Sequence, residues 1–275
     1  MKGKINCKSC NTLFEGNYCN KCGEKVIYRE DRTIRHFMGE LFNAFTFADN
    51  KLWRTIRHIV FQPGVYSLNY ISGKRVKVMK PISIFFLANL LYFLIPSINT
   101  FTTPLNIQMR AFAYSPMVSK WVDDEVENRG IDFEEYELKY DAKTTELSKM
   151  LLIVMTFMFS LTFSIIHFKS KQHLLADHLA ISLELMTFIL LICVQLLGII
   201  GNGLRMLGFS WLVSNQGSSI MAGVGLIYFF LFMEKNFYHF EGWRRYANIL
   251  FSIAAVVLIL LLYRLLLFFV TFMVV

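Results

Sequence analysis

Long apolar blocks separated by short polar segments dominate the chain after residue 81. The blocks cover residues 82–98, 150–168, 179–200, 218–233 and 248–275. A bilayer-crossing helix needs about 20 predominantly apolar residues, and these blocks approach or exceed that length. We therefore expect a mainly α, polytopic helical membrane protein with about five transmembrane helices.

Two segments before the first block place apolar residues at steps of three and four, which indicates amphipathic helices. They cover residues 33–47 and 51–61, and the second ends at Pro63 and Gly64, which punctuate helices. Such helices either lie among lipid headgroups or pack on the cytoplasmic ends of the spans, and the pattern leaves both open.

The pattern divides the chain into three parts. We expect a small N-terminal module over residues 1–25, basic amphipathic helices over 26–81, and a five-span domain over 82–275. Within the last part, residues 99–149 are polar and prone to form helices, and Gly130 breaks them into a pair. We place this polar region outside the cytoplasm, over the outer mouth of the spans.

Charge sets the orientation. Residues 1–81 hold 15 Lys and Arg against 6 acidic residues, whereas residues 99–149 hold 6 basic against 10 acidic residues. Because Lys and Arg are retained on the cytoplasmic side, the N-terminus is expected inside and the C-terminus outside. The cations border the first apolar block, which favours an anionic membrane surface over nucleic acid as their partner. The expected membrane-surface residues are Arg35, Lys51, Arg54, Arg57, Lys74, Arg75, Lys77 and Lys80.

Composition strengthens the membrane assignment. The chain is 55% hydrophobic and contains 27 Phe in 275 residues, and its mean hydropathy is +0.45. These values exclude an ordinary soluble domain.

Four of the five cysteines lie in the first 22 residues. Cys7, Cys10, Cys19 and Cys22 form the pattern C-x2-C-x8-C-x2-C, in which each C-x-x-C turn aims two thiolates at one tetrahedral ion. A pair of redox dithiols or disulfides is the alternative, which a reducing cytoplasm disfavours. Four cysteine ligands leave no coordination position for water, so the sequence predicts a structural Zn2+ ion.

The third apolar block carries a polar stripe. Asp177, Glu184, Gln195 and Asn202 are separated by 7, 11 and 7 residues, which returns each side chain to within roughly 20° of one line along a helix. These groups either join neighbouring helices or line a path for a solute or a proton. From their depths we expect two intramembrane polar layers, Asn89–Glu184–Tyr228 and Gln195–Arg264.

Histidines gather in the predicted cytoplasmic turn after the second block. His167, His173, Asp177 and His178 could ligate a second metal ion, but their spacing does not follow the i, i+4 pattern of a helical metal pair. Histidines at a membrane interface are the commoner explanation.

Several motifs together resemble a known family. The four-cysteine ribbon, Arg54 and Thr55 followed by Pro63 and Gly64, the YISGKR of residues 70–75, and Pro81 before the first block are similar to the bacterial zinc-ribbon membrane proteins of domain-of-unknown-function family 3667. The resemblance covers residues 7–95 and implies a bacterial inner membrane, but it implies no activity. Five spans with a cytoplasmic N-terminus are also similar to Yip1-type proteins, in topology alone.

These observations support three classes of function. The first is a non-enzymatic scaffold or adaptor that engages a cytoplasmic protein or anionic lipid. The second is a small-solute or proton-coupled transporter built on the polar stripe. A lipid-modifying enzyme comes last, because the sequence shows no nucleophile with a partner base and no open metal site. A homo-oligomer is compatible with each class.

Overall fold

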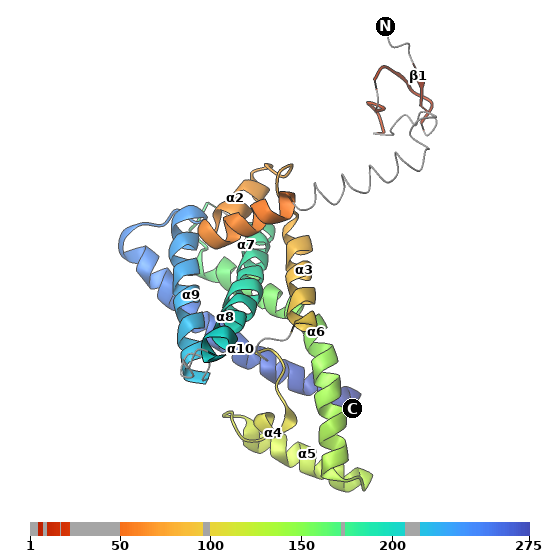
Figure 1. The fold of residues 1–275 in the computed structure, drawn as a ribbon, viewed down its shortest axis with the longest axis vertical. Coiled ribbons are helices and arrows are strands. Elements are labelled where there is room, and N and C mark those ends of the chain that lie inside the picture. Colours follow the sequence, from red (N-terminus) through yellow and green to blue (C-terminus); the bar gives the residue numbers. More distant parts are fainter. Residues whose placement is uncertain are drawn as a thin grey trace. The chain divides into compact units, whose positions relative to one another are not determined.

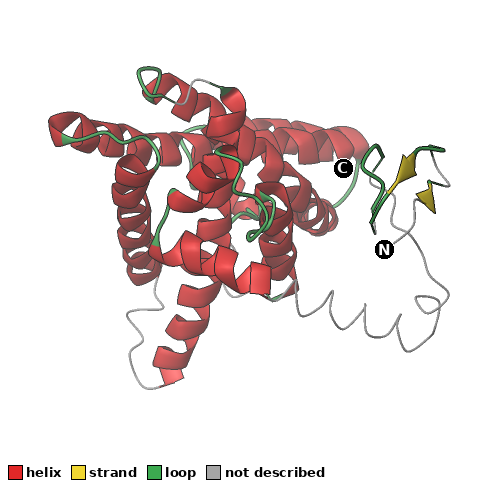
Figure 2. Ribbon diagram, turned by 90° about the horizontal axis from the view of Figure 1, so that it is seen from above, coloured by secondary structure: helices red, strands yellow, loops and turns green. Residues whose placement is uncertain are grey.

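A computed structural model of the chain describes residues 5–7, 10–16, 18–22, 50–95, 100–171, 174–206 and 215–275, without the side chains of residues 202, 204–206, 215 and 216 (Figures 1 and 2). The chain divides into two compact units, Met1–Lys51 and Leu52–Val275. The predicted amphipathic helix over residues 33–47, with Arg35, lies outside the described residues.

The N-terminal unit contains a two-stranded antiparallel hairpin of β1 (Ile5–Asn6) and β2 (Leu13–Phe14), in which Ile5 pairs with Phe14. Among the described residues these are the only strands of a sheet, and Figure 2 draws them in yellow. The connecting turn closes when the backbone N–H of Asn11 donates to the carbonyl of Cys7, and Asn11 takes a left-handed φ of 55°. Asn tolerates this conformation better than most residues.

All the regular elements described in the second unit are helices. It begins with a helix that continues to residue 61, and its other elements follow in chain order. They are α2 (Val65–Ile71), α3 (Pro81–Leu94), α4 (Leu105–Gln108), α5 (Ser115–Arg129), α6 (Phe133–Ile166), α7 (Leu175–Phe188), η2 (Ile189–Leu196), α8 (Leu197–Met206), α9 (Asn215–Asn236) and α10 (Gly242–Val274).

Four helical stretches are long and apolar enough to cross a membrane: Phe133–Ile166, Leu175–Gly201, Gly217–Asn236 and Gly242–Val274. The second stretch runs through α7, η2 and α8, and it is buried over 67% of its most apolar window, about twice the share of the other three. It contacts α2, α3, α6 and α9, so it forms the centre of the bundle (Figure 1). The chain is thus mainly helical, and the length and composition of these four helices suit a membrane protein.

The first predicted span is shorter than expected, and five full crossings are not confirmed. It corresponds to α3, whose 14 residues span about 21 Å, against a hydrocarbon core of about 30 Å. The helix ends at Leu94, and Ile95 has left the helical region at φ −124° and ψ 77°. The next residue in the sequence is Pro96, which disfavours a helical conformation in the residue before it.

The polar region over residues 99–149 differs partly from the prediction. Gly130 does separate two helices, because it adopts a left-handed φ of 62° at the end of α5. The second helix is not short, however, because it continues as the 34-residue α6, one of the four helices long and apolar enough to cross a membrane. A second apolar core joins α4 and α5 to the N-terminal part of α6 and the C-terminal part of α10. Its buried members are Leu105, Val118, Val122, Tyr136, Tyr140 and Phe268.

The central helix contains an eight-residue π-helical segment, η2. A wider turn of this kind shifts the side chains that follow it relative to an α-helix and often marks a functional or crowded position. Here Gly225 of α9 lies against η2, since a Cβ at Gly225 would stand 3.0 Å from the Cys193 Sγ. Cys193 is buried, as expected for a cysteine that packs as a small apolar residue.

Candidate functional sites

The four N-terminal cysteines converge. Their sulfur atoms all lie within 4.8 Å of one another, with Cys7 and Cys22 3.5 Å apart and Cys10 and Cys19 3.6 Å apart. Four sulfurs at about 2.3 Å from a tetrahedral ion would stand about 3.8 Å apart. The cluster could therefore bind a metal ion with little rearrangement.

The surroundings of Cys10 favour the thiolate form that a metal requires. A hydrogen bond with the Thr12 hydroxyl is the main cause that lowers the pKa of Cys10 to about 6, and bonding to the Thr12 backbone adds to it. Cys7 and Cys19 are buried with Phe14 in the small core of the unit, whereas Cys22 is exposed. All four positions are thiols, so the geometry suits an ion that holds the hairpin together.

In the second unit, Glu184 is a buried connector. Its carboxylate accepts hydrogen bonds from the backbone N–H of Gly64 at 2.7 Å, the backbone N–H of Ser67 at 3.0 Å and the Ser67 hydroxyl at 2.5 Å. Gly64 is the N-cap of α2 and has no side chain with which to cap it. Glu184 thus supplies the missing cap from another helix, where the positive end of a helix dipole favours a carboxylate.

The close packing of the Pro63–Gly64 turn explains why a glycine stands there. Gly64 has a φ of +86°, and a Cβ on it would stand 3.1 Å from the Phe237 Cβ and 3.3 Å from the Met233 Cα. Asn236 also donates to the carbonyl of Pro63 at 3.0 Å. The turn is therefore held against the end of α9, and its N–H is aimed at Glu184.

Other residues of the same segment fix the chain that leads to α3. The Thr55 hydroxyl accepts a hydrogen bond from the backbone N–H of Met79 at 3.0 Å, and the Tyr66 hydroxyl donates to the carbonyl of Met79 at 2.8 Å. Burial raises the pKa of Tyr66 above its ordinary value, and the nearby Glu184 carboxylate adds to this effect. The phenol therefore stays a neutral donor.

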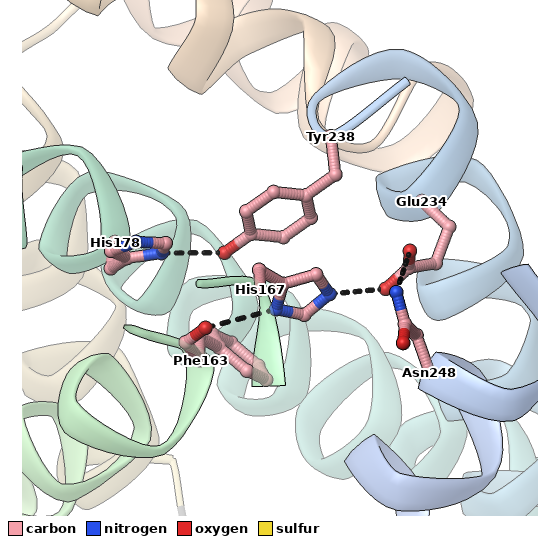
Figure 3. A network of polar contacts seen from close by, with 6 residues as sticks. All are labelled: Phe163, His167, His178, Glu234, Tyr238 and Asn248. Atoms are coloured by element: carbon pink, nitrogen blue, oxygen red, sulfur yellow. Dashed lines mark hydrogen bonds and ion pairs between the residues drawn. The ribbon is translucent and has the colours of Figure 1, made fainter. Parts of the chain in front are cut away.

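A second buried network ties four helices together at the same end (Figure 3). His167, directly after α6, is 2.5 Å from Glu234 of α9 through its Nε2, and both side chains are fully buried. The other ring nitrogen lies 3.0 Å from the carbonyl of Phe163, and Asn248 of α10 donates to the second Glu234 oxygen at 3.2 Å. His178 of α7 joins through Tyr238, whose hydroxyl is 2.9 Å from the His178 Nδ1.

Donors and acceptors fix the protons in this network. The His167 Nδ1 faces a carbonyl oxygen, so it must carry a proton and donate it. The Nε2 and the Glu234 Oε1 then need one further proton between them, because two lone pairs at 2.5 Å would repel each other. With that proton the pair is neutral overall, as either an imidazolium with a carboxylate or an imidazole with a carboxylic acid. Buried charge is thereby avoided.

Aromatic stacking completes this cluster. The rings of His167 and Tyr238 are 3.6 Å apart and nearly parallel, at 4°. Burial raises the pKa of Tyr238 well above its ordinary value, and the Glu234 carboxylate raises it further. Of the three histidines considered for a second metal site, His167 and His178 therefore have protein partners. His173 lies outside the described residues.

Two members of the predicted polar stripe, Glu184 and Gln195, make contacts between elements. Glu184 bonds to Gly64 and Ser67, and Gln195 donates to the carbonyls of Leu91 and Ile95 at the end of α3. Asp177 is partly buried, and the side chain of Asn202 lies outside the described residues.

The predicted layers of polar residues are wrong in their partners. Glu184 bonds to the turn before α2 and not to Asn89 or Tyr228. Asn89 instead donates to the carbonyl of Lys149 at 3.0 Å, and Tyr228 donates to that of Val60 at 2.8 Å. The prediction failed because it compared depths along straight spans only. It left out the turn at Gly64 and helix α2, which pack against α7 and α9.

At the other end of the bundle, Arg264 contributes through both its backbone and its side chain. Its carbonyl accepts a hydrogen bond from Gln108 at 3.1 Å. Its guanidinium lies 5.2 Å from the centre of the Phe112 ring. Arg264 therefore helps to hold the polar outer region on α10.

The predicted membrane-surface cations lie on the exposed surface wherever the structure describes them. Arg75 makes two contacts with Tyr70: its Nε donates to the carbonyl of Tyr70, and its guanidinium covers the Tyr70 ring. The exposed set comprises Lys51, Arg54, Arg57, Lys74, Arg75, Lys77 and Lys80. Large apolar side chains interleave with them, since Trp53 and Phe61 are 70% and 66% exposed.

Sequence reasoning missed most of the buried network. Glu234 is a single acid near the end of an apolar block, and Tyr238 and Asn248 have no distinctive spacing. One signal could have found it: Glu234 is a carboxylate within a stretch of membrane-spanning length, and a carboxylate in that position requires a partner.

The comparisons with known proteins are sparse. The chain matches no curated protein and no solved structure. Residues 49–93, which contain the buried turn at Gly64 and all of α3 except its last residue, match the model of a family described as protein of unknown function (DUF3667). This is the family that the motifs from Arg54 to Arg75 had indicated.

Proposed function

We propose that this protein is a non-enzymatic membrane scaffold whose N-terminal unit is a structural zinc ribbon that docks a cytoplasmic protein. The observation that carries the proposal is the use of the buried polar groups. Glu184, His167 and Glu234 each bond to another element of the chain, which leaves them little capacity for a substrate.

The same contacts disfavour the other two classes. A transporter needs intramembrane polar groups that can exchange partners, whereas Glu184 accepts three hydrogen bonds from one rigid turn. A hydrolytic enzyme needs a nucleophile beside its base, yet the buried His167 faces a carboxylate and a carbonyl.

The identity of the metal follows from its ligands. Four thiolates at tetrahedral separations select zinc or an iron–sulfur centre, and C-x2-C pairs on a small hairpin are typical of structural zinc. Leu13 and Tyr18 of this unit are 64% and 61% exposed. They offer a small apolar surface for a protein partner.

We place the basic end of the second unit in the cytoplasm of a bacterial cell, with the chain in the inner membrane. This basic end comprises residues 50–80, the α6–α7 turn and the α9–α10 turn, which the contacts of Glu184, Asn236 and His178 bring together. Lys and Arg are retained on the cytoplasmic side of a membrane, so the cations of this end support its cytoplasmic location.

Although α3 is short, the chain crosses most of the bilayer by residue 101. The Tyr263 hydroxyl lies 3.3 Å from the carbonyl of Phe101 and 3.4 Å from that of Ser148. Ser148 stands 18 residues, about 27 Å, from the basic end of α6. This supports a cytoplasmic N-terminus and an extracytoplasmic C-terminus.

The proposal can be tested by photo-crosslinking in living cells. A photoreactive amino acid at Leu13 should trap one discrete protein, and the product should disappear when Cys19 and Cys22 are changed to serine. The same probe at Leu138, which is 69% exposed on α6, is the matched control. A crosslinking pattern that is insensitive to the loss of the thiols, or identical at both positions, would contradict a docking ribbon.

A further inference from the structure

The turn between α9 and α10 encloses a surface hollow of about 390 Å³ that nothing described so far explains. Three basic side chains line it, Lys235, His239 and Arg245, and Glu241 is the one carboxylate on its wall. Its volume lies within the range of small-ligand sites. The balance of charge favours an anion.

The guanidinium of Arg245 makes one hydrogen bond within the protein and keeps another donor without a partner among the described residues. One of its terminal nitrogens donates to the carbonyl of Leu231 at 2.6 Å, which fixes the guanidinium in place. Its Nε–H is buried and has no hydrogen-bond partner among the residues that the structure describes. Buried donors nearly always find an acceptor, so the guanidinium of Arg245 keeps unused hydrogen-bonding capacity in a residue that lines the hollow.

The backbone adds positive charge to the same place. Glu241 is the N-cap of the 33-residue α10, but its side chain makes no capping bond. The first N–H groups of α10 therefore keep their partial positive charge beside the hollow. Lys235 also lines the hollow, is exposed, and forms no ion pair within the described part of the chain.

The position of the hollow identifies the source of the anion. It lies where two apolar helices end, and Trp243 and Tyr246 stand next to it with 82% and 59% of their surface exposed. Tyr246 also lines the hollow. Exposed Trp and Tyr at the ends of membrane helices are typical of the headgroup region, where lipid phosphates are concentrated.

We propose that this hollow binds the phosphate of an anionic phospholipid headgroup. Arg245 and Lys235 would bind the phosphate oxygens from two sides, and Tyr246 would contact the apolar part of the lipid. The proposal rests on the membrane orientation of the proposed function, because anionic lipid is enriched on the cytoplasmic face. It is independent of the ribbon and of any protein partner.

The test uses the purified full-length protein in a neutral detergent. Isothermal titration with short-chain phosphatidylglycerol should show saturable binding, and short-chain phosphatidylcholine and inorganic phosphate should bind much more weakly. Lys235→Gln should weaken the binding of phosphatidylglycerol about fivefold, as expected for one cation near a membrane surface. Glu241→Gln should strengthen it, because the variant removes the only acidic side chain on the wall.

Arg244→Gln is the matched control, because Arg244 is an exposed cation of the same turn that does not line the hollow. Its affinity should change less than twofold. Equal losses in the Lys235 and Arg244 variants would show diffuse attraction and overturn the site. Equal affinity for phosphatidylcholine would overturn the anionic lipid, and equal affinity for inorganic phosphate would assign the hollow to a free anion.

Discussion

Removing one member of the buried His167–Glu234 pair should cost far more stability than removing both. In His167→Phe, the phenyl ring can keep the stacking on Tyr238, but Glu234 loses the group that shares its proton and retains only Asn248. Both side chains are fully buried, so water cannot replace the lost partner. Breaking a buried pair by removing one partner costs about 3–5 kcal/mol.

The conservative and double variants separate this effect from simple packing. In Glu234→Gln, the amide can donate to the His167 Nε2 and accept from Asn248, so every hydrogen bond survives in neutral form. We expect a cost of about 1 kcal/mol. His167→Phe combined with Glu234→Leu removes both polar groups and should be close to the parent, because apolar replacement of a buried pair is often neutral or stabilising.

The assay is reversible unfolding in mixed micelles with increasing dodecyl sulfate, followed by far-ultraviolet circular dichroism. The free energy of unfolding should rank the parent and the double variant highest, Glu234→Gln next and His167→Phe lowest. A double-mutant cycle then gives the coupling between the two side chains. Additive losses, or a His167→Phe variant within 1 kcal/mol of the parent, would refute a shared proton in this contact.

Three further predictions concern the metal, the orientation and the buried turn. Purified protein should contain about one zinc per chain, and substoichiometric zinc in metal analysis at neutral pH would contradict the ribbon. Zinc should also leave as the pH falls, because the lowered pKa of Cys10 gives a thiolate that is present above about pH 6 and lost below it. An impermeant maleimide should label Lys120→Cys in intact cells but reach Lys171→Cys only after permeabilisation, and the reverse pattern would place the basic end outside. Gly73→Ala should cost about 1–2 kcal/mol, as for any left-handed alanine, because open space surrounds that position. Gly64→Ala should cost clearly more in the same unfolding assay, because its Cβ would press on α9, and equal costs would show that the crowding is unimportant.

Local chemistry alone determined several features of this protein. The four cysteines converge as their spacing predicted, since each C-x-x-C turn places two sulfurs close together whatever the rest of the chain does. Apolar length predicted the helices after α3, because a helix satisfies its backbone within one segment of the bilayer. Gly130 ended α5 as expected, because glycine adopts the left-handed conformation at low cost.

Only the tertiary structure decided which polar groups meet. Glu184 and Gly64 are separated by 120 residues, and no periodicity relates them. At Glu184 and Gln195 the stripe marked side chains that bond to other parts of the protein. Depth along a helix could not reveal that the turn before α2, and not another span, supplies the partners of Glu184. Likewise, the pairing of His167 with Glu234 depends on how α6 and α9 end at the same level. Such contacts arise from the cost of burying an unpaired polar group, which is settled only when all the helices have packed.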